Sequence, residues 1–337
     1  MYKLLFLTTL VMGTLITISS NSWLGVWMGL EMNLLSIIPL MNNSKSPKST
    51  EASLKYFITQ AMASLILLMG MMMDSIKSDI PSNIWTESLF FLCITTSLVT
   101  KTGAAPFHFW FPEVVEGLDW FNALLMLTWQ KIAPMITLMY INMNETLITF
   151  LMLTSIAVGG VMGLNQTSMK KIMSYSSINH IGWMLGALVF TETLWSWYFL
   201  IYSITNSLII WAFSKFNISS ISQFLMVSKT APQLKMFLTL NFLSLGGIPP
   251  FIGFLPKWLT IQVLVQNQMY FSSCLMVVMT LITLYFYMRI ALSPLSLSTS
   301  NVIPINQKQK MNKKTFVTIN SALLMSLMLS TLTFNWI

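Results

Sequence analysis

The sequence predicts an all-α polytopic membrane protein with about eleven transmembrane helices. Hydrophobic residues make up 55% of the 337 residues, charged residues make up only 8%, and the mean hydropathy is +0.70. No polar stretch is long enough to fold outside the lipid, so residues 1–337 are expected to form a single membrane domain. The count of helices comes from successive apolar segments of about 20 residues, the length that crosses the hydrocarbon layer.

The apolar segments are joined by short loops. The fourth and the ninth segments are too long for one straight crossing and contain Gly and Pro, so both are expected to be broken helices. The first segment contains no cleavage signal and is interpreted as a membrane span. The expected spans are residues 3–20, 22–41, 54–73, 84–112, 120–142, 145–165, 172–190, 195–215, 235–265, 270–292 and 315–335.

A short motif occurs once in each of the two over-long segments. Residues 103–112 and 247–256 share the frame G-x-x-P-F-x-x-x-x-P at an offset of 144 residues. The offset covers five spans, an odd number, so the second copy is expected to run through the membrane in the opposite direction. We therefore interpret residues 3–142 and 145–292 as two inverted five-helix repeats and residues 315–335 as an extra C-terminal helix. Such repeats are typical of secondary transporters, although two Pro-kinked packing helices would give the same frame.

The basic residues indicate the orientation of the chain. Three lysines lie inside spans, and eleven spans place fourteen of the other fifteen Lys and Arg residues on the amino-terminal side, with Lys77 alone on the opposite side. Basic loops face the cytoplasm or the mitochondrial matrix. The N-terminus and the basic loops, among them those at Lys170–Lys171 and Lys308–Lys314, are therefore expected on that side, and the C-terminus on the other.

Four charged residues lie within apolar segments, where an unpaired ammonium costs about 2.5–3.5 kcal/mol. They are Glu31, Lys101, Lys131 and Lys257. Lys131 lies near the centre of its span, while Lys101 and Lys257 each border one of the expected breaks. A buried lysine changes its affinity for a proton when a carboxylate approaches or withdraws. We therefore predict that these residues carry protons, although Lys257 is also placed to extend to the membrane surface and Glu31 to remain protonated.

The two histidines are further candidates for moving protons. His108 lies within the first motif, and His180 lies in a polar run inside the seventh span. A hydrated channel and a hydrogen bond between helices explain the position of His180 equally well.

The composition argues against several other functions. The two cysteines, Cys93 and Cys274, cannot supply the four thiolates of an iron–sulfur cluster, and no His or Cys cluster has the spacing of a metal site. We therefore expect no cofactor and no metal in this chain. The net charge of +8 is spread over short loops, which is typical of a topology signal and not of a nucleic-acid partner.

With these residues established, the chain resembles the antiporter-like membrane subunits of respiratory complex I, and among them subunit 2 of the mitochondrial NADH:ubiquinone oxidoreductase in its insect-like form. The stretches that carry the resemblance are 27–33 (WMGLEMN), 101–113 (KTGAAPFHFWFPE), 128–134 (TWQKIAP), 175–184 (YSSINHIGWM) and 243–258 (LSLGGIPPFIGFLPKW).

The resemblance implies a role for each buried charge. Glu31 is the modulating acid beside Lys101, Lys131 is the central carrier, and Lys257 is the carrier or exit group of the inverted half. It also implies a multi-pass protein of the mitochondrial inner membrane, in contact with phospholipids and with other membrane-arm and accessory subunits. Flavin, iron–sulfur clusters and ubiquinone are expected in the rest of the complex. The alternatives are a stand-alone sodium/proton antiporter subunit and a non-conducting assembly scaffold, which would not explain four charges at the middle of the membrane.

Overall fold

The computed structural model describes residues 2–42, 46–77, 84–141, 144–230 and 232–296. Within these ranges the chain is helical, and its only strand-like pairing is an isolated bridge between Ser168 and Ser220. This confirms the expected all-α class. The helix expected at 315–335 and the basic loop at Lys308–Lys314 lie outside the described residues.

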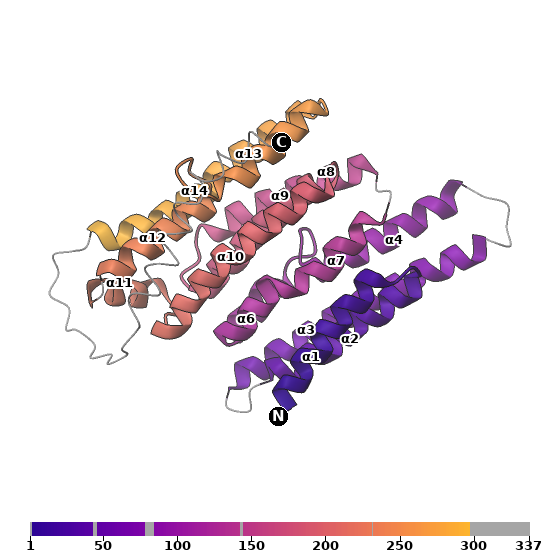
Figure 1. Ribbon diagram of the computed structural model, residues 1–337, viewed down its shortest axis with the longest axis horizontal. Helices are drawn as coiled ribbons and strands as arrows, with labels where there is room; N and C mark the ends of the chain where they lie inside the picture. The colour runs from indigo at the N-terminus through magenta and orange to yellow at the C-terminus, as the bar shows by residue number, and fades with distance from the viewer. Residues whose placement is uncertain (1, 43–45, 78–83, 142–143, 231, 297–337) are drawn as a thin grey trace. The chain divides into compact units, whose positions relative to one another are not determined.

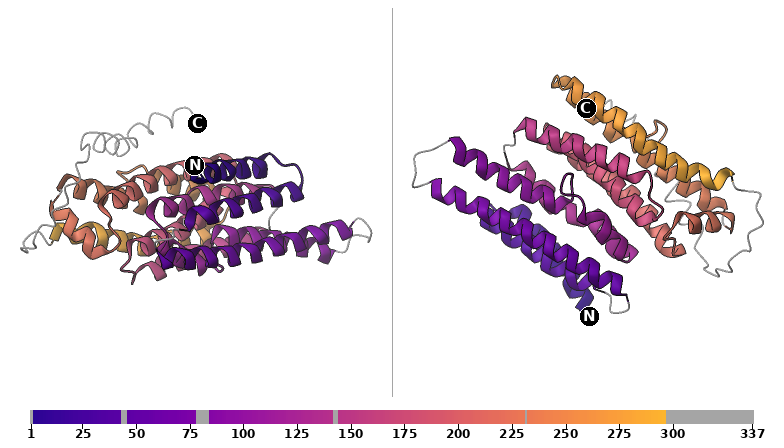
Figure 2. Two further views of the ribbon diagram at one scale, coloured as in Figure 1. Left: turned by 90° about the horizontal axis from the view of Figure 1, so that it is seen from below. Right: turned by 180° about the vertical axis from the view of Figure 1, so that it is seen from behind.

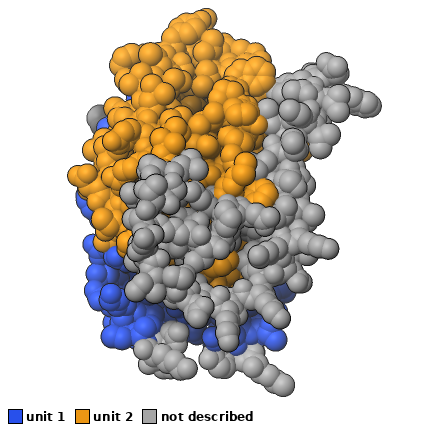
Figure 3. All heavy atoms as spheres, turned by 90° about the vertical axis from the view of Figure 1, so that its left-hand side faces the viewer, with its two compact units in different colours: residues 1–155 blue, residues 156–337 orange. Residues whose placement is uncertain are grey.

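The chain divides into two compact units, Met1–Ser155 and Ile156–Ile337, which Figure 3 shows in different colours. The first unit contains seven helices and the start of α8 among its described residues (Figure 1). They are α1 (Tyr2–Ser19), α2 (Trp23–Met41), α3 (Pro47–Lys77), α4 (Ile84–Thr102), α5 (Trp110–Gly117), α6 (Trp120–Leu127), α7 (Trp129–Met139) and α8 (Glu145–Gly163), which continues into the second unit.

The first two helices of the first unit depend on an N-cap residue and on small residues at their contact. Helix α2 begins after Ser22, whose hydroxyl accepts a hydrogen bond from the Gly25 amide at 3.3 Å and so satisfies one free N–H of the first turn. Helices α1 and α2 lie side by side (Figure 2). A Cβ atom at Gly13 would lie 2.5 Å from Asn33 Oδ1, and one at Gly29 would lie 2.5 Å from Thr17 Cγ2. The two backbones approach this closely only because both positions are glycine.

The fifth expected span, residues 120–142, is divided in the structure. Helix α6 ends at Leu127, α7 begins at Trp129, and Thr128 between them has φ −119° and ψ −72°. The amide and the hydroxyl of Thr128 both donate to the Leu124 carbonyl, at 3.0 and 2.7 Å. Nothing in the sequence predicted this irregularity, which lies directly before the helix that carries Lys131.

The second unit contains six further helices in its described part. They are α9 (Met169–Leu188), α10 (Glu192–Phe216), α11 (Ile221–Thr230), α12 (Pro232–Gly246), α13 (Phe254–Gln266) and α14 (Tyr270–Ser296). Helix α11 lies in a segment that was expected to be a loop. Its start is a capping box, in which Ser220 Oγ accepts from the Gln223 amide while Gln223 Oε1 accepts from the Ser220 amide, both at 3.4 Å.

Helix α9 is almost entirely buried. Every residue from Ile172 to Leu188 is buried, including Ser174, Asn179 and His180. A helix that is covered on all sides, and yet carries several polar side chains, needs partners for them inside the protein. The polar run around His180 therefore lies in the interior.

Five described helices are long and apolar enough to cross a membrane on their own, and three shorter apolar helices accompany them. The five are Trp23–Met41, Pro47–Met73, Glu145–Gly163, Glu192–Phe216 and Tyr270–Leu292. The expected span at 120–142 is interrupted and its pieces do not reach this length, and the expected span at 315–335 lies outside the described residues. The count of eleven stays a prediction.

Candidate functional site

The first break in a helix lies between α4 and α5. Gly103, immediately after α4, has φ +77°, a conformation that residues with a Cβ rarely adopt. Its amide contacts the Thr100 carbonyl at 3.2 Å, and the Ala104 amide reaches back to the Val99 carbonyl at 3.3 Å. Such bonds end a helix by satisfying the last carbonyls with the two residues that follow. The chain then runs without helical structure to α5.

The second break, between α12 and α13, repeats this geometry. Gly247 has φ +81°, its amide contacts the Ser244 carbonyl at 3.0 Å, and the Ile248 amide contacts the Leu243 carbonyl at 3.4 Å. A further pair matches as well, because Phe111 donates to the His108 carbonyl at 3.0 Å and Leu255 donates to the Ile252 carbonyl at 3.2 Å. All three correspondences have the 144-residue offset of the sequence motif. The motif therefore encodes the same turn twice.

Lys257 lies on α13, and its ammonium is held at the second break. The side chain is 6% exposed and donates to the carbonyls of Leu245 and Gly246, at 3.2 and 2.9 Å. The ring of Trp183 on α9 lies 6.0 Å from the ammonium, within the range of a cation–π contact. The break exposes carbonyls at the end of α12, and these solvate the charge inside the unit instead of at its surface.

Lys101 and Glu31 lie near each other in the first unit. Lys101 is in the last turn of α4 and is 6% exposed, and the charge of Glu31 on α2 acts on it. Both residues lie in the described part of the chain, and no direct ion pair joins them. Glu31 Oε1 is buried and accepts no hydrogen bond from the described residues. The two opposite charges are therefore neighbours without a direct ion pair.

Lys131 is the most deeply buried of the three lysines. It is 1% exposed and lies in the first turn of α7, directly after the irregularity at Thr128. Its ammonium lies 5.8 Å from the centre of the Phe111 ring on α5. Each of the three lysines thus lies within one helical turn of the point where a helix is interrupted. The sequence predicted such an interruption beside only two of them.

The two histidines belong to different units. His108 lies within the first break, is 4% exposed and contacts the Pro106 carbonyl through Nδ1 at 3.2 Å. His180 on α9 is also 4% exposed, and its Nδ1 forms a hydrogen bond of 2.9 Å with the hydroxyl of Tyr198 on α10. The bond between α9 and α10 is one of the two explanations that the sequence left open for His180.

A small cavity lies beside His180. It has a volume of about 10 Å³, enough for a single water molecule, and its lining includes His180, Tyr202, Ser244 and Pro256. Pro256 directly precedes Lys257. The second unit thus brings His180 and the turn that carries Lys257 to one small cavity, whereas Glu31, Lys101, Lys131 and His108 belong to the first unit.

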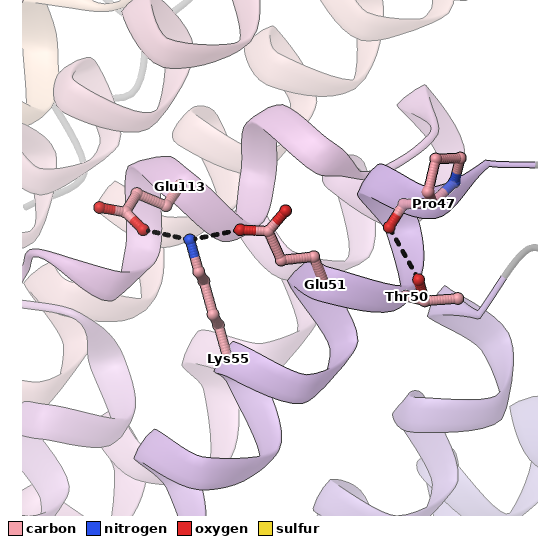
Figure 4. Close-up of polar contacts among 5 residues, drawn as sticks. All are labelled: Pro47, Thr50, Glu51, Lys55 and Glu113. Carbon is pink, nitrogen blue, oxygen red and sulfur yellow. Dashed lines mark hydrogen bonds and ion pairs between the residues drawn. The ribbon is translucent and has the colours of Figure 1, made fainter.

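Lys55 was not singled out by the sequence, and it pairs with Glu113, an acidic residue that follows the first break. Figure 4 shows its ammonium between two carboxylates, 2.9 Å from Glu51 Oε1 and 2.8 Å from Glu113 Oε2. Glu51 and Lys55 are one helical turn apart, a spacing that favours an ion pair on a helix. The contact with Glu113 spans 58 residues and had no signal in the sequence.

Metal-binding side chains do not gather in the described ranges. These ranges contain no group of three or more His, Cys, Asp or Glu residues that could hold a metal ion. Cys93 is half-buried and Cys274 is exposed, and both are free thiols.

Comparisons with known proteins agree with this geometry. The family described as NADH:quinone oxidoreductase/Mrp antiporter, TM, matches residues 20–283. The NADH-ubiquinone oxidoreductase chain 2 of Anopheles gambiae is 50% identical over 86% of this chain and 84% of its own length. The corresponding protein of Aedes aegypti is 48% identical over 97% of this chain and 96% of its own length.

Solved structures share the fold. A chain of respiratory complex I from Thermus thermophilus, solved with bound aureothin, has a TM-score of 0.88 and 24% identity over 98% of this chain and 79% of its own length. A chain of the Mrp complex from Dietzia has a TM-score of 0.76 and 17% identity over 85% of this chain and 59% of its own length.

Interrupted membrane helices that enclose buried lysines define an antiporter-like membrane subunit. The chain belongs to the NADH:quinone oxidoreductase/Mrp antiporter family, and within it to the NADH-ubiquinone oxidoreductase chain 2 proteins. The comparisons confirm the resemblance that was drawn from the sequence.

Proposed function

We propose that this chain is the antiporter-like core subunit of a proton-translocating NADH:ubiquinone oxidoreductase, and that protons cross the membrane through its buried Glu/Lys axis. The observation that carries this proposal is the burial of three lysines, of which Lys101 and Lys257 are each 6% exposed and Lys131 is 1% exposed. Charged groups are retained at such positions at a cost of several kcal/mol, and they mark ion pathways in membrane proteins.

The proposed roles follow from the surroundings of each residue. Lys131 is the central carrier, and Glu31 modulates Lys101 by approaching or withdrawing from it. Lys257 is the carrier or exit group of the second unit, where the carbonyls of α12 solvate its charge when it is protonated. His108 and His180 are proposed to pass protons, and the water-sized cavity at His180 supports this for the second unit.

Residues 3–142 and 145–292 are proposed to be two inverted repeats, with a further C-terminal helix at 315–335 and eleven spans in all. Matching helix bounds support this proposal. A shift of 144 residues moves α1 to 146–163, where α8 covers 145–163, and moves α2 to 167–185, where α9 covers 169–188. It moves α5 to 254–261, the start of α13 at 254–266. A shared fold of this kind is typical of transporters.

The setting of the protein is also part of the proposal. We place it in the mitochondrial inner membrane as a multi-pass protein, with its N-terminus and basic loops in the matrix and its C-terminus in the intermembrane space. Its partners are other membrane-arm and accessory subunits of complex I and phospholipids, and not nucleic acid. Flavin, iron–sulfur clusters and ubiquinone belong to the rest of the complex. Electron transfer in other subunits therefore drives proton movement through this one.

A stand-alone cation/proton antiporter subunit is the second candidate function. The structural similarity to a chain of the Mrp complex favours it. Relatives that are 50% and 48% identical bear the name NADH-ubiquinone oxidoreductase chain 2, which favours the complex I subunit.

Replacing Lys131 with methionine tests the proposal. Methionine keeps most of the volume of the stem and removes the charge, so the complex should assemble while the number of protons pumped per NADH falls. Lys215→Met, at an exposed position on α10, is the matched control and should pump as the wild type does. The measurement is proton uptake per NADH oxidised in sealed vesicles that contain equal amounts of assembled complex. A Lys131→Met enzyme with the normal ratio and rate would refute the role of Lys131.

A further inference from the structure

Tyr56 on α3 lies between the two parts of the axis in the first unit. Its side chain is 3% exposed, and the ring of Trp110 on α5 packs against it with 5.8 Å between ring centres. Its hydroxyl donates to Gln130 Oε1 on α7 at 3.4 Å. This distance is long for such a bond, so the contact can tighten. Gln130 directly precedes Lys131, and Tyr56 therefore reaches the turn that carries the central lysine.

The same tyrosine also lies near the acid of the axis. The charge of Glu31 acts on the Tyr56 hydroxyl, as it does on Lys101. Glu31 is thus the common neighbour of Lys101 and Tyr56. Lys101, Glu31, Tyr56, Gln130 and Lys131 thus form a series of neighbouring polar residues, in which the hydrogen bond from Tyr56 to Gln130 is the direct contact.

Several atoms along this series have unused hydrogen-bonding capacity. Glu31 Oε1, Gln130 Nε2 and Gln60 Nε2, one turn after Tyr56 on α3, are buried and have no hydrogen-bond partner in the described part of the chain. Buried amide and carboxylate groups are rarely left in this state, and internal water or a change of conformation usually satisfies them. Such atoms mark places where hydrogen bonds can be exchanged.

We propose that Tyr56 and Gln130 are positioning residues that couple the Glu31–Lys101 pair to Lys131. When Glu31 moves relative to Lys101, the Tyr56 hydroxyl responds and changes its hydrogen bond to Gln130, which displaces the turn that holds Lys131. No bond other than hydrogen bonds is made or broken. The inference rests on the proposed function, because it assigns Lys131 as the carrier whose position is adjusted.

Tyr56→Phe removes the hydroxyl and keeps the ring that packs against Trp110. Loss of one such hydrogen bond corresponds to about a fivefold lower rate of coupled turnover. Tyr140→Phe is the matched control, because it removes the hydroxyl of an exposed tyrosine in the same unit that donates to the Ile18 carbonyl at 3.2 Å. The control should turn over as the wild type does. Equal turnover in Tyr56→Phe and wild type would overturn the inference.

A double-mutant cycle separates coupling from a general loss of stability. If the two residues act independently, the fold-reduction of coupled turnover in the double variant equals the product of the fold-reductions caused by Tyr56→Phe and by Glu31→Gln. We expect a smaller reduction than this product, because each substitution interrupts the same series. A merely structural tyrosine would give independent effects, and that outcome contradicts the inference. If Tyr56→Phe does not assemble, Gln130→Met takes its place in the same cycle, with the same two outcomes.

The pH profile of turnover is a second readout that packing alone would not change. Glu31 from α2, Lys101 from α4 and Lys131 from α7 are the charged groups of this series, and Glu113 from α5 pairs with Lys55 one residue before Tyr56. Tyr56→Phe should shift the profile, whereas Tyr140→Phe should not. Lys131→Met in parallel distinguishes the two proposals. If Lys131→Met pumps normally, the proposed function is refuted. If Lys131→Met does not pump while Tyr56→Phe matches the wild type, only the coupling role of Tyr56 is refuted.

Discussion

The ammonium of Lys257 donates to the carbonyl of Gly246 at 2.9 Å. Gly246 is the last residue of α12, and its carbonyl is available because the helix stops there instead of continuing to a residue whose amide would bond to it. The interruption of the helix and the burial of the charge are thus one structural feature. The two partners are eleven positions apart in the sequence, and the break brings them together.

Gly247→Ala should disturb this feature. A Cβ atom at Gly247 would lie 2.9 Å from Lys257 Cδ and 3.1 Å from its Nζ, and φ +81° disfavours alanine by about 1–2 kcal/mol. We expect a lower thermal midpoint of the assembled complex and slower coupled turnover. Gly246→Ala is the control, because its Cβ would make only an ordinary 3.6 Å contact with Tyr287. Two variants with equal midpoints and equal turnover would show that the turn does not hold Lys257 in place.

Glu31 and Lys101 should behave as a coupled pair. Glu31→Gln leaves the ammonium of Lys101 without its acidic neighbour, whereas adding Lys101→Met removes that ammonium as well. The double variant should therefore lose less coupled turnover than the combined losses of the two single variants would give if the residues acted independently. The measurement is a double-mutant cycle on turnover and proton pumping at equal amounts of assembled enzyme. Independent effects within error would mean that the two residues act separately.

Single-cysteine labelling should reveal the orientation. In a background with Cys93→Ser and Cys274→Ser, Asn165→Cys lies in the exposed loop before Lys170–Lys171 and Gln268→Cys lies in the exposed loop between α13 and α14. The eleven-span topology places the first on the matrix side and the second on the opposite side, the side also expected for the segment after Lys77. A membrane-impermeant thiol reagent added from one side should label one variant only. Labelling of both variants from the same side would contradict the eleven-span topology.

The positions of both helix breaks and of the buried charges could be predicted from the sequence. These features depend on local properties, because a stretch that combines Gly and Pro favours a helix break and a lysine within an apolar segment is recognised by its neighbours. The shared frame at Gly103 and Gly247 therefore locates both turns. The family could also be recognised, because the stretches around Glu31, Lys131 and His180 are specific in combination.

Other features required the tertiary structure. The ion pair of Lys55 with Glu113 joins residues 58 positions apart, and the contact of Tyr56 with Gln130 joins residues 74 positions apart. The irregularity at Thr128 and the short helix α11 depend on hydrogen bonds made by individual hydroxyl and amide groups. The order of residues along the chain specifies where it is apolar, where its helices break and which charges are left inside. The packing of the helices specifies which polar groups those charges meet, because such partners are set by the distance between helices and not by the distance along the chain.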